Sequence, residues 1–152
     1  MHTQIVYAPA FQRPSGKMYL GTDQLNLTHG LPTDINLDTV SSGFCDEIED
    51  VIEHKITPGR AGLYLIVGQV SFFSVVADKE YCANLELNDS TYISTNVIHA
   101  ALAEILCVPV IALVWLSLTD YIKLIGQSNA DVDTVDVVGQ KDSTFLFVQR
   151  VR

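Results

Sequence analysis

Residues 62–67 read Gly-Leu-Tyr-Leu-Ile-Val, residues 110–116 read Val-Ile-Ala-Leu-Val-Trp-Leu, and residues 145–148 read Phe-Leu-Phe-Val. These stretches are apolar throughout, as in strands that are buried on both faces and need cover on both. Helices provide this cover in α/β proteins, but the sequence shows no long helical pattern. We therefore expect a sheet that packs inward on a second sheet and outward on other copies of the chain.

Other stretches alternate between apolar and polar residues. Along residues 81–88, Tyr, Ala, Leu and Leu share one face, and Cys, Asn, Glu and Asn share the other. Residues 51–57 and 121–127 alternate in a similar way. A period of two with one polar side predicts strands in a sheet that exposes one face to solvent.

Turn residues separate these stretches, which predicts an all-β sandwich or barrel. The expected strands are residues 18–28, 34–37, 51–57, 62–73, 81–87, 92–98, 108–116, 121–127 and 144–151. One stretch stays open between two structures. Apolar residues at positions 98, 101, 102, 105 and 106 follow a helical spacing, so residues 100–106 form either a short helical turn or an extended segment.

Composition and charge restrict the kinds of partner that the chain is expected to bind. Apolar residues make up 48% of the chain and charged residues 18%, below the roughly 25% of ordinary soluble domains. This deficit suggests apolar surface that a partner covers. The net charge of −9 argues against nucleic acid, because phosphate binding needs clustered Lys and Arg.

The 152 residues suffice for one domain. Residues 1–17 are interrupted by Pro and Gly and keep no period, so we expect an N-terminal arm there and one domain over residues 18–152. The apolar stretch at residues 97–118 contains His99, Glu104 and Pro109, so no membrane span is expected. Residues 1–11 lack the basic start and apolar run of a secretory signal.

Catalytic residue types occur without the spacing that catalysis requires. The four histidines are far apart, and no metal-binding, nucleophile or phosphate-loop motif is present, so neither an enzyme activity nor a cofactor is expected. Asp131, Asp133 and Asp136 lie close together along one loop. Carboxylate oxygens can hold calcium, so this loop is either simply solvated or a weak cation site.

The three cysteines, an odd and sparse set, make no disulfide framework. We expect Cys45, Cys82 and Cys107 to be buried free thiols.

Three segments together resemble the tumour-necrosis-factor-like jelly roll, which the globular head of complement component 1q shares. Residues 56–65 are similar to the family's turn into an apolar strand with Gly62 and Tyr64, residues 114–124 to a strand, turn and strand, and residues 143–151 to its closing strand. The sequence departs from the family pattern at Thr119, where Gly is usual, and at Asn88 and Asp89, where Asn-Gly is usual.

The resemblance implies a two-sheet antiparallel jelly roll that assembles as a compact homotrimer through its inner sheet. We accordingly expect eight residues to form the trimer interface or the core of the inner sheet. These are Tyr64, Ile66, Phe72, Leu113, Trp115, Phe145, Phe147 and Val148. The alternative is a monomer with one unusually thick core, with or without the N-terminal arm folded across the apolar surface.

Two functional hypotheses follow for a non-enzymatic trimer. The family is mostly extracellular, whereas this chain shows neither an export signal nor a disulfide framework, which favours a virion protein such as a capsid decoration protein or the head of a phage fibre or spike. The arm at residues 1–17 would then bind a capsid or other virion protein. The alternative is an extracellular module that recognises a cell-surface protein or glycan.

Overall fold

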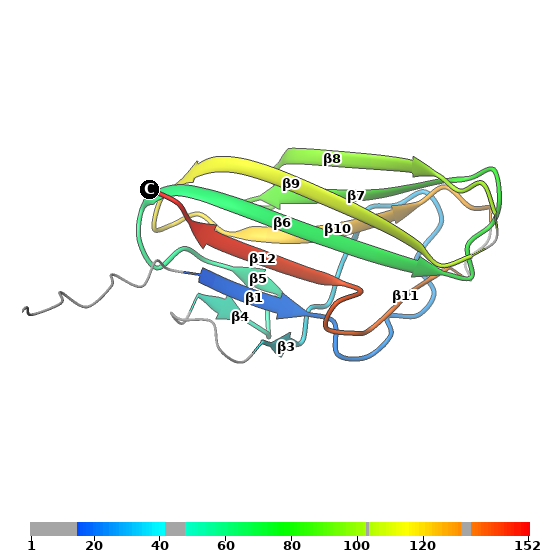
Figure 1. The fold of residues 1–152 in the computed structure, drawn as a ribbon, viewed down its shortest axis with the longest axis horizontal. Coiled ribbons are helices and arrows are strands. Elements are labelled where there is room, and N and C mark those ends of the chain that lie inside the picture. The colour runs from blue at the N-terminus through cyan, green and yellow to red at the C-terminus, as the bar shows by residue number, and fades with distance from the viewer. Residues whose placement is uncertain (1–14, 42–47, 103, 132–134) are drawn as a thin grey trace, which may run out of the picture.

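The computed structural model describes residues 15–41, 48–102, 104–131 and 135–152. Within these ranges the chain forms twelve strands and no helix, arranged in two facing antiparallel sheets (Figure 1). The expectation of an all-β, two-sheet antiparallel fold is thus confirmed. The strands are β1 (Ser15–Tyr19), β2 (Thr33–Asp34), β3 (Thr39–Val40), β4 (Glu49–Asp50), β5 (Lys55–Ile56), β6 (Gly62–Phe73), β7 (Glu80–Leu87), β8 (Thr91–His99), β9 (Leu106–Leu116), β10 (Ile122–Ser128), β11 (Asp136–Val137) and β12 (Phe145–Arg150).

The inner sheet runs in the order β3, β1, β12, β6 and β9, with β11 beside the end of β6 on the β12 side. The outer sheet runs in the order β4, β5, β10, β7 and β8, with β2 paired to β10. Strand β6 is the longest and pairs along its whole length up to Phe72 with β9. The described residues contain no helix with the length and apolar character that a membrane crossing requires.

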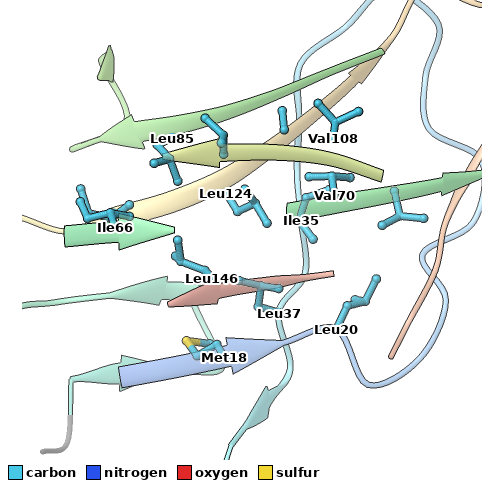
Figure 2. Close-up of a cluster of buried hydrophobic side chains, with 14 of the residues drawn as sticks. Met18, Leu20, Ile35, Leu37, Ile66, Val70, Leu85, Val108, Leu124 and Leu146 are labelled. Carbon is cyan, nitrogen blue, oxygen red and sulfur yellow. The ribbon is translucent and has the colours of Figure 1, made fainter. Parts of the chain in front are cut away.

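The core lies between the two sheets and follows the alternation of their strands. Ile66 of β6 and Leu146 of β12 point toward Leu85 of β7 and Leu124 of β10, as Figure 2 shows, and all four side chains are fully buried. Burial of each such side chain contributes about 1.5–3 kcal/mol. Gly68 lets the sheets approach here, because a Cβ at this position would lie 2.8 Å from a methyl group of Leu124.

Residues 51–57 are not the single strand that their alternation predicts. They form the turn and second strand of a short hairpin, in which β4 pairs with β5. The carboxylate of Asp50 accepts hydrogen bonds from the backbone N–H groups of Ile52 and Glu53, each at 3.0 Å, and these bonds hold the turn. His54 completes it with a φ of 54°. Ile52 is 85% exposed, so its apolar character does not mark a buried face.

The stretch left open at residues 98–106 contains no helical turn among the described residues. Strand β8 continues to His99 and β9 begins at Leu106. Ala100 donates its N–H to the carbonyl of Lys79 at 2.9 Å, and its own carbonyl accepts the N–H of Asp78 at 2.7 Å. These bonds tie the connection between β8 and β9 to the neighbouring β6–β7 turn. They also satisfy the backbone groups of Ala100 without a helix.

The first expected strand also differs from the observed one. Strand β1 begins at Ser15, inside the range expected for the arm, and ends at Tyr19 rather than at residue 28. Beyond it the chain makes a long excursion, in which Gln24 pairs with Val137 and Asn26 adopts a φ of 58°. Residues 1–14, the remainder of the expected arm, lie outside the described residues.

The position of the core predicts that replacing a buried leucine lowers stability far more than replacing an exposed one. Leu124→Ala should lower the free energy of unfolding by about 2–5 kcal/mol, because it leaves a cavity between the sheets. Leu118→Ala, in a side chain that is 61% exposed, should change it by less than about 0.5 kcal/mol. Urea unfolding of both variants measures the difference, and equal effects would contradict this description of the core.

Candidate functional surface on the inner sheet

The outward side of the inner sheet is apolar over several strands. In β6 the inward residues Tyr64 and Ile66 are fully buried, and the alternating Leu63, Leu65 and Val67 therefore point outward. The same alternation directs side chains of β9, β12 and β1 outward. We call this surface the apolar face; it consists of Tyr19, Leu63, Leu65, Val67, Ile111, Leu113, Trp115, Phe145 and Phe147.

Strand register brings these side chains into rows across the sheet. Phe147 lies opposite Val67, and Val67 lies opposite Ile111. Leu65 lies opposite Leu113, and Leu63 lies opposite Trp115. The four strands β1, β12, β6 and β9 lie side by side in Figure 1, so the rows form one continuous surface.

The β9 part of the apolar face is the most open. Ile111 is 60% exposed, Leu113 63% and Trp115 64%. A soluble monomer seldom leaves large contiguous apolar patches in contact with water. Three large side chains in alternate positions of one strand therefore indicate a surface that a partner covers.

Charge is confined to the border of the apolar face. The outward positions of β6, β9 and β12, all of them described, carry no charged side chain. Lys17 lies at the β1 border, where its ammonium stands 4.4 Å from the centre of the Phe145 ring and 3.4 Å from the Asp142 carboxylate. An uncharged centre with a polar border is the distribution found in stable protein interfaces.

Side chains of the outer sheet bond to part of the free edge of β9. The Ser94 hydroxyl donates to the carbonyl of Ile111 at 2.8 Å, and the Asn96 amide donates to the carbonyl of Pro109 at 2.7 Å. Pro109 has no N–H to lose at this edge. Because these two carbonyls are already bonded, this part of the edge is poorly suited to the addition of another strand.

The structure divides the eight residues expected at the interface or in the core into two groups. Tyr64, Ile66, Phe72 and Val148 are buried between the sheets, with exposed fractions of 0–1%. The other four belong to the apolar face: Leu113, Trp115, Phe145 and Phe147.

Sequence reasoning missed five members of the apolar face: Tyr19, Leu63, Leu65, Val67 and Ile111. The alternation that puts Tyr64 inside puts Leu63 and Leu65 outside, but a wholly apolar stretch does not reveal which set faces the core.

The acidic loop brings its carboxylates to separate partners. Asp131 forms an ion pair with Lys79, which lowers the pKa of its carboxyl, and lies 3.8 Å from the His29 ring nitrogen. Asp136 accepts the N–H of Asn26 at 2.7 Å. Asp133 lies outside the described residues, which contain no group of three or more His, Cys, Asp or Glu side chains able to hold a metal. Asp131 and Asp136 are therefore held by different partners, an ammonium group and a backbone N–H.

The expectation of buried thiols is wrong for Cys107. Its side chain is exposed on β9, and its sulfur lies 3.2 Å from the Ser71 hydroxyl. It is exposed because odd-numbered positions of β9 point outward. Cys82 is half-buried, and burial together with the nearby Glu80 carboxylate raises the pKa of its thiol. Cys45 lies outside the described residues.

The turn at Asn88 and Asp89 adopts the geometry that Asn-Gly would provide. Both residues have positive φ values, 56° and 52°, as the central residues of a tight hairpin turn require. The Asn88 amide donates to the Asp120 carboxylate at 2.9 Å, and its oxygen accepts the N–H of Tyr121 at 2.9 Å. Thr119 needs no such geometry, since its φ is not positive. The departures from the family pattern are therefore accommodated locally.

A search of protein-family models finds no match to this sequence, and a search of curated proteins finds none either. Solved structures do match. Eiger TNF of S. frugiperda superposes with a TM-score of 0.69 at 10% identity, covering 93% of this chain and 94% of that one. The globular domain of zebrafish complement 1qA gives 0.65 at 10% identity, covering 92% and 98%.

A third structure, murine APRIL, gives a TM-score of 0.66 at 12% identity over 91% of this chain and 99% of that one. The fold is the tumour-necrosis-factor-like jelly roll. The resemblance inferred from the three sequence segments is thereby confirmed. At 10–12% identity the similarity between this jelly roll and the three structures establishes the fold alone.

The Asp120 carboxylate predicts a pH-dependent contribution to stability. The Asn88 amide, and then the backbone and hydroxyl of Ser117, lower its pKa from the usual 3.8. A lowered pKa contributes stability above about pH 4 that is lost as the pH falls further. Asp120→Asn should therefore lower the melting temperature at pH 7, and the difference from the unmodified protein should shrink below about pH 4.

Melting temperatures between pH 2.5 and 7 test this, with Asp78→Asn as a control that makes the same charge change in an exposed side chain. A difference between Asp120→Asn and the unmodified protein that stays constant over this range would contradict the assignment.

Proposed function

We propose that this chain is a non-enzymatic binding module that assembles as a homotrimer through the apolar face. The observation that carries the proposal is the uncharged surface across β12, β6 and β9, on which Trp115, Leu113 and Ile111 are each at least 60% exposed. Covering each large side chain contributes about 1.5–3 kcal/mol, so several per subunit favour a permanent assembly.

A second and third copy of the chain suit the apolar face better than an unrelated partner. The jelly roll that this chain shares with tumour-necrosis-factor-like proteins implies a compact threefold trimer built on the inner sheet. Around a threefold axis, the surface of one subunit packs against a different surface of the next, and the ring closes. A face that combines the exposed β9 row with the half-buried β6 and β12 rows offers two such unlike surfaces.

Replacement of Trp115 by Glu should break the trimer, because it buries an uncompensated charge at the interface. The unmodified protein should have about three times the chain mass of 16.7 kDa, and Trp115→Glu should have the mass of one chain. Leu118→Glu is the matched control, since Leu118 is 61% exposed but lies past the end of β9. Sedimentation equilibrium gives the masses, and far-UV circular dichroism verifies that each variant is folded.

A monomeric unmodified protein at micromolar concentration would refute the assembly proposal. A folded trimer in the Trp115→Glu variant would refute the choice of surface.

Removal of residues 1–14 distinguishes the trimer from a monomer covered by its own arm. The deletion leaves β1, which begins at Ser15, intact. If sister chains cover the apolar face, the shortened protein keeps the trimer mass and its melting temperature. If the arm covers it, the full chain is monomeric, and the shortened one binds hydrophobic dyes or aggregates. Analytical ultracentrifugation with a dye-binding assay measures both.

The proposal also concerns the molecule that the trimer binds. The sequence predicts two kinds of partner. One is a capsid or other virion protein, bound through the N-terminal arm. The other is a cell-surface protein or glycan, bound through loops. Residues 1–14 lie outside the described residues, so the attachment to a particle stays a prediction. The shortened protein also tests it, because a trimer without residues 1–14 that still joins its particle contradicts an anchoring arm.

A further inference from the structure

An open cavity of about 640 Å³ lies at the end of the sandwich where β6 finishes. This end is opposite the C-terminus in Figure 1, where Arg152 bonds to Leu63 at the start of β6. The volume lies within the roughly 300–1,000 Å³ of ligand-binding clefts. The residues that shape it include Phe73, Val75, Ile105 and Val138, with carboxylates from Asp23 and Glu104.

Hydrogen bonds from several segments hold one wall of this cavity in place. Gly139 donates its N–H to the Asp23 carboxylate at 2.7 Å, and Val138 donates to the carbonyl of Ser71 at 2.8 Å. Gln24 and Val137 exchange two backbone hydrogen bonds, at 3.0 and 2.8 Å. The wall is therefore anchored to both β6 and the excursion after β1, and binding would cost little ordering of the backbone.

The charged side chains among the described lining residues are all negative. Two carboxylates and the neutral polar residues Ser74 and Gln140 accompany the apolar side chains, and the described residues that line the cavity include no Lys, Arg or His. Ile105 is 65% exposed, so part of the lining is an open apolar surface. A ligand that carries a positive charge next to an apolar group suits this lining. The positive charge would pair with the carboxylates, and the apolar group would cover Ile105 and its neighbours.

We propose that this cavity binds a Lys or Arg side chain, with an adjacent apolar side chain, on a loop of a partner protein. The cavity opens to solvent at the tip of the sandwich, which suits a protruding loop, and the net charge of −9 attracts basic partners. The described residues that line the cavity are not members of the apolar face, so the site goes beyond the proposed trimer and does not require it.

Three blocked tripeptides, Leu-Lys-Leu, Leu-Gln-Leu and Leu-Glu-Leu, probe the site with the protein labelled at isoleucine methyl groups. The Ile105 methyl signal reports on the cavity, and that of Ile52, which is 85% exposed in the turn between β4 and β5, reports on non-specific contact. The Lys peptide should shift Ile105 and leave Ile52 unchanged. It should bind more tightly than the Gln peptide, and the Gln peptide more tightly than the Glu peptide.

Two variants test the carboxylates. Asp23→Asn keeps the oxygen that accepts the Gly139 N–H, and Glu104→Gln changes an exposed side chain, so both should remain folded. Each should weaken binding of the Lys peptide by roughly two- to fivefold, the range for a partly exposed ion pair, and leave binding of the Gln peptide unchanged. Glu53→Gln, in the turn between β4 and β5, is the matched control and should change neither.

Equal binding of the three peptides, shifts that spread to Ile52, or no Ile105 shift up to the solubility limit would each overturn the proposal. Repeating the titration on Trp115→Glu separates this site from the trimer. Selective binding by a monomeric variant shows that the cavity functions alone, whereas selective binding that is lost with the trimer would overturn its assignment to a single chain.

Discussion

The alternation of β6 between an inward and an outward face is the constraint on which the rest of the structure depends. Its inward side chains, such as Tyr64 and Ile66, close the core against the outer sheet, while Leu63 and Leu65 contribute to the apolar face. Because β12 and β9 pair along its two edges, their register transmits the same alternation across the inner sheet. A single strand thus determines both the interior and the surface proposed for assembly.

The edge of β9 controls how that surface can be used. An exposed edge strand normally invites another strand to pair with it. Here Ser94 and Asn96 of β8 bond to its carbonyls, and Pro109 removes a donor. The apolar side chains of β9 remain open although part of its backbone edge is closed, so β9 is better suited to side-chain packing than to the addition of a strand.

Two segments depart from the periodic pattern of their sequences for local physical reasons. Residues 51–57 alternate as a strand would, but the Asp50 carboxylate captures two backbone N–H groups and stabilises a turn instead. The apolar residues around position 102 follow a helical spacing, yet bonds between Ala100 and the β6–β7 turn satisfy the backbone without a helix. In both segments a side-chain or tertiary hydrogen bond outweighs the periodic pattern, and a pattern cannot register such bonds.

The sequence alone determined the all-β class, the two kinds of strand and the presence of apolar surface beyond one core, because these depend on residue types and their spacing. Only the tertiary structure decided that Tyr64 is interior while Leu113 and Trp115 are exposed, because a wholly apolar strand has no polar side to orient it. The tertiary structure also brought Asp23 and Glu104 to one cavity. Residues so far apart along the chain share a site only because the fold brings the ends of several strands and loops together.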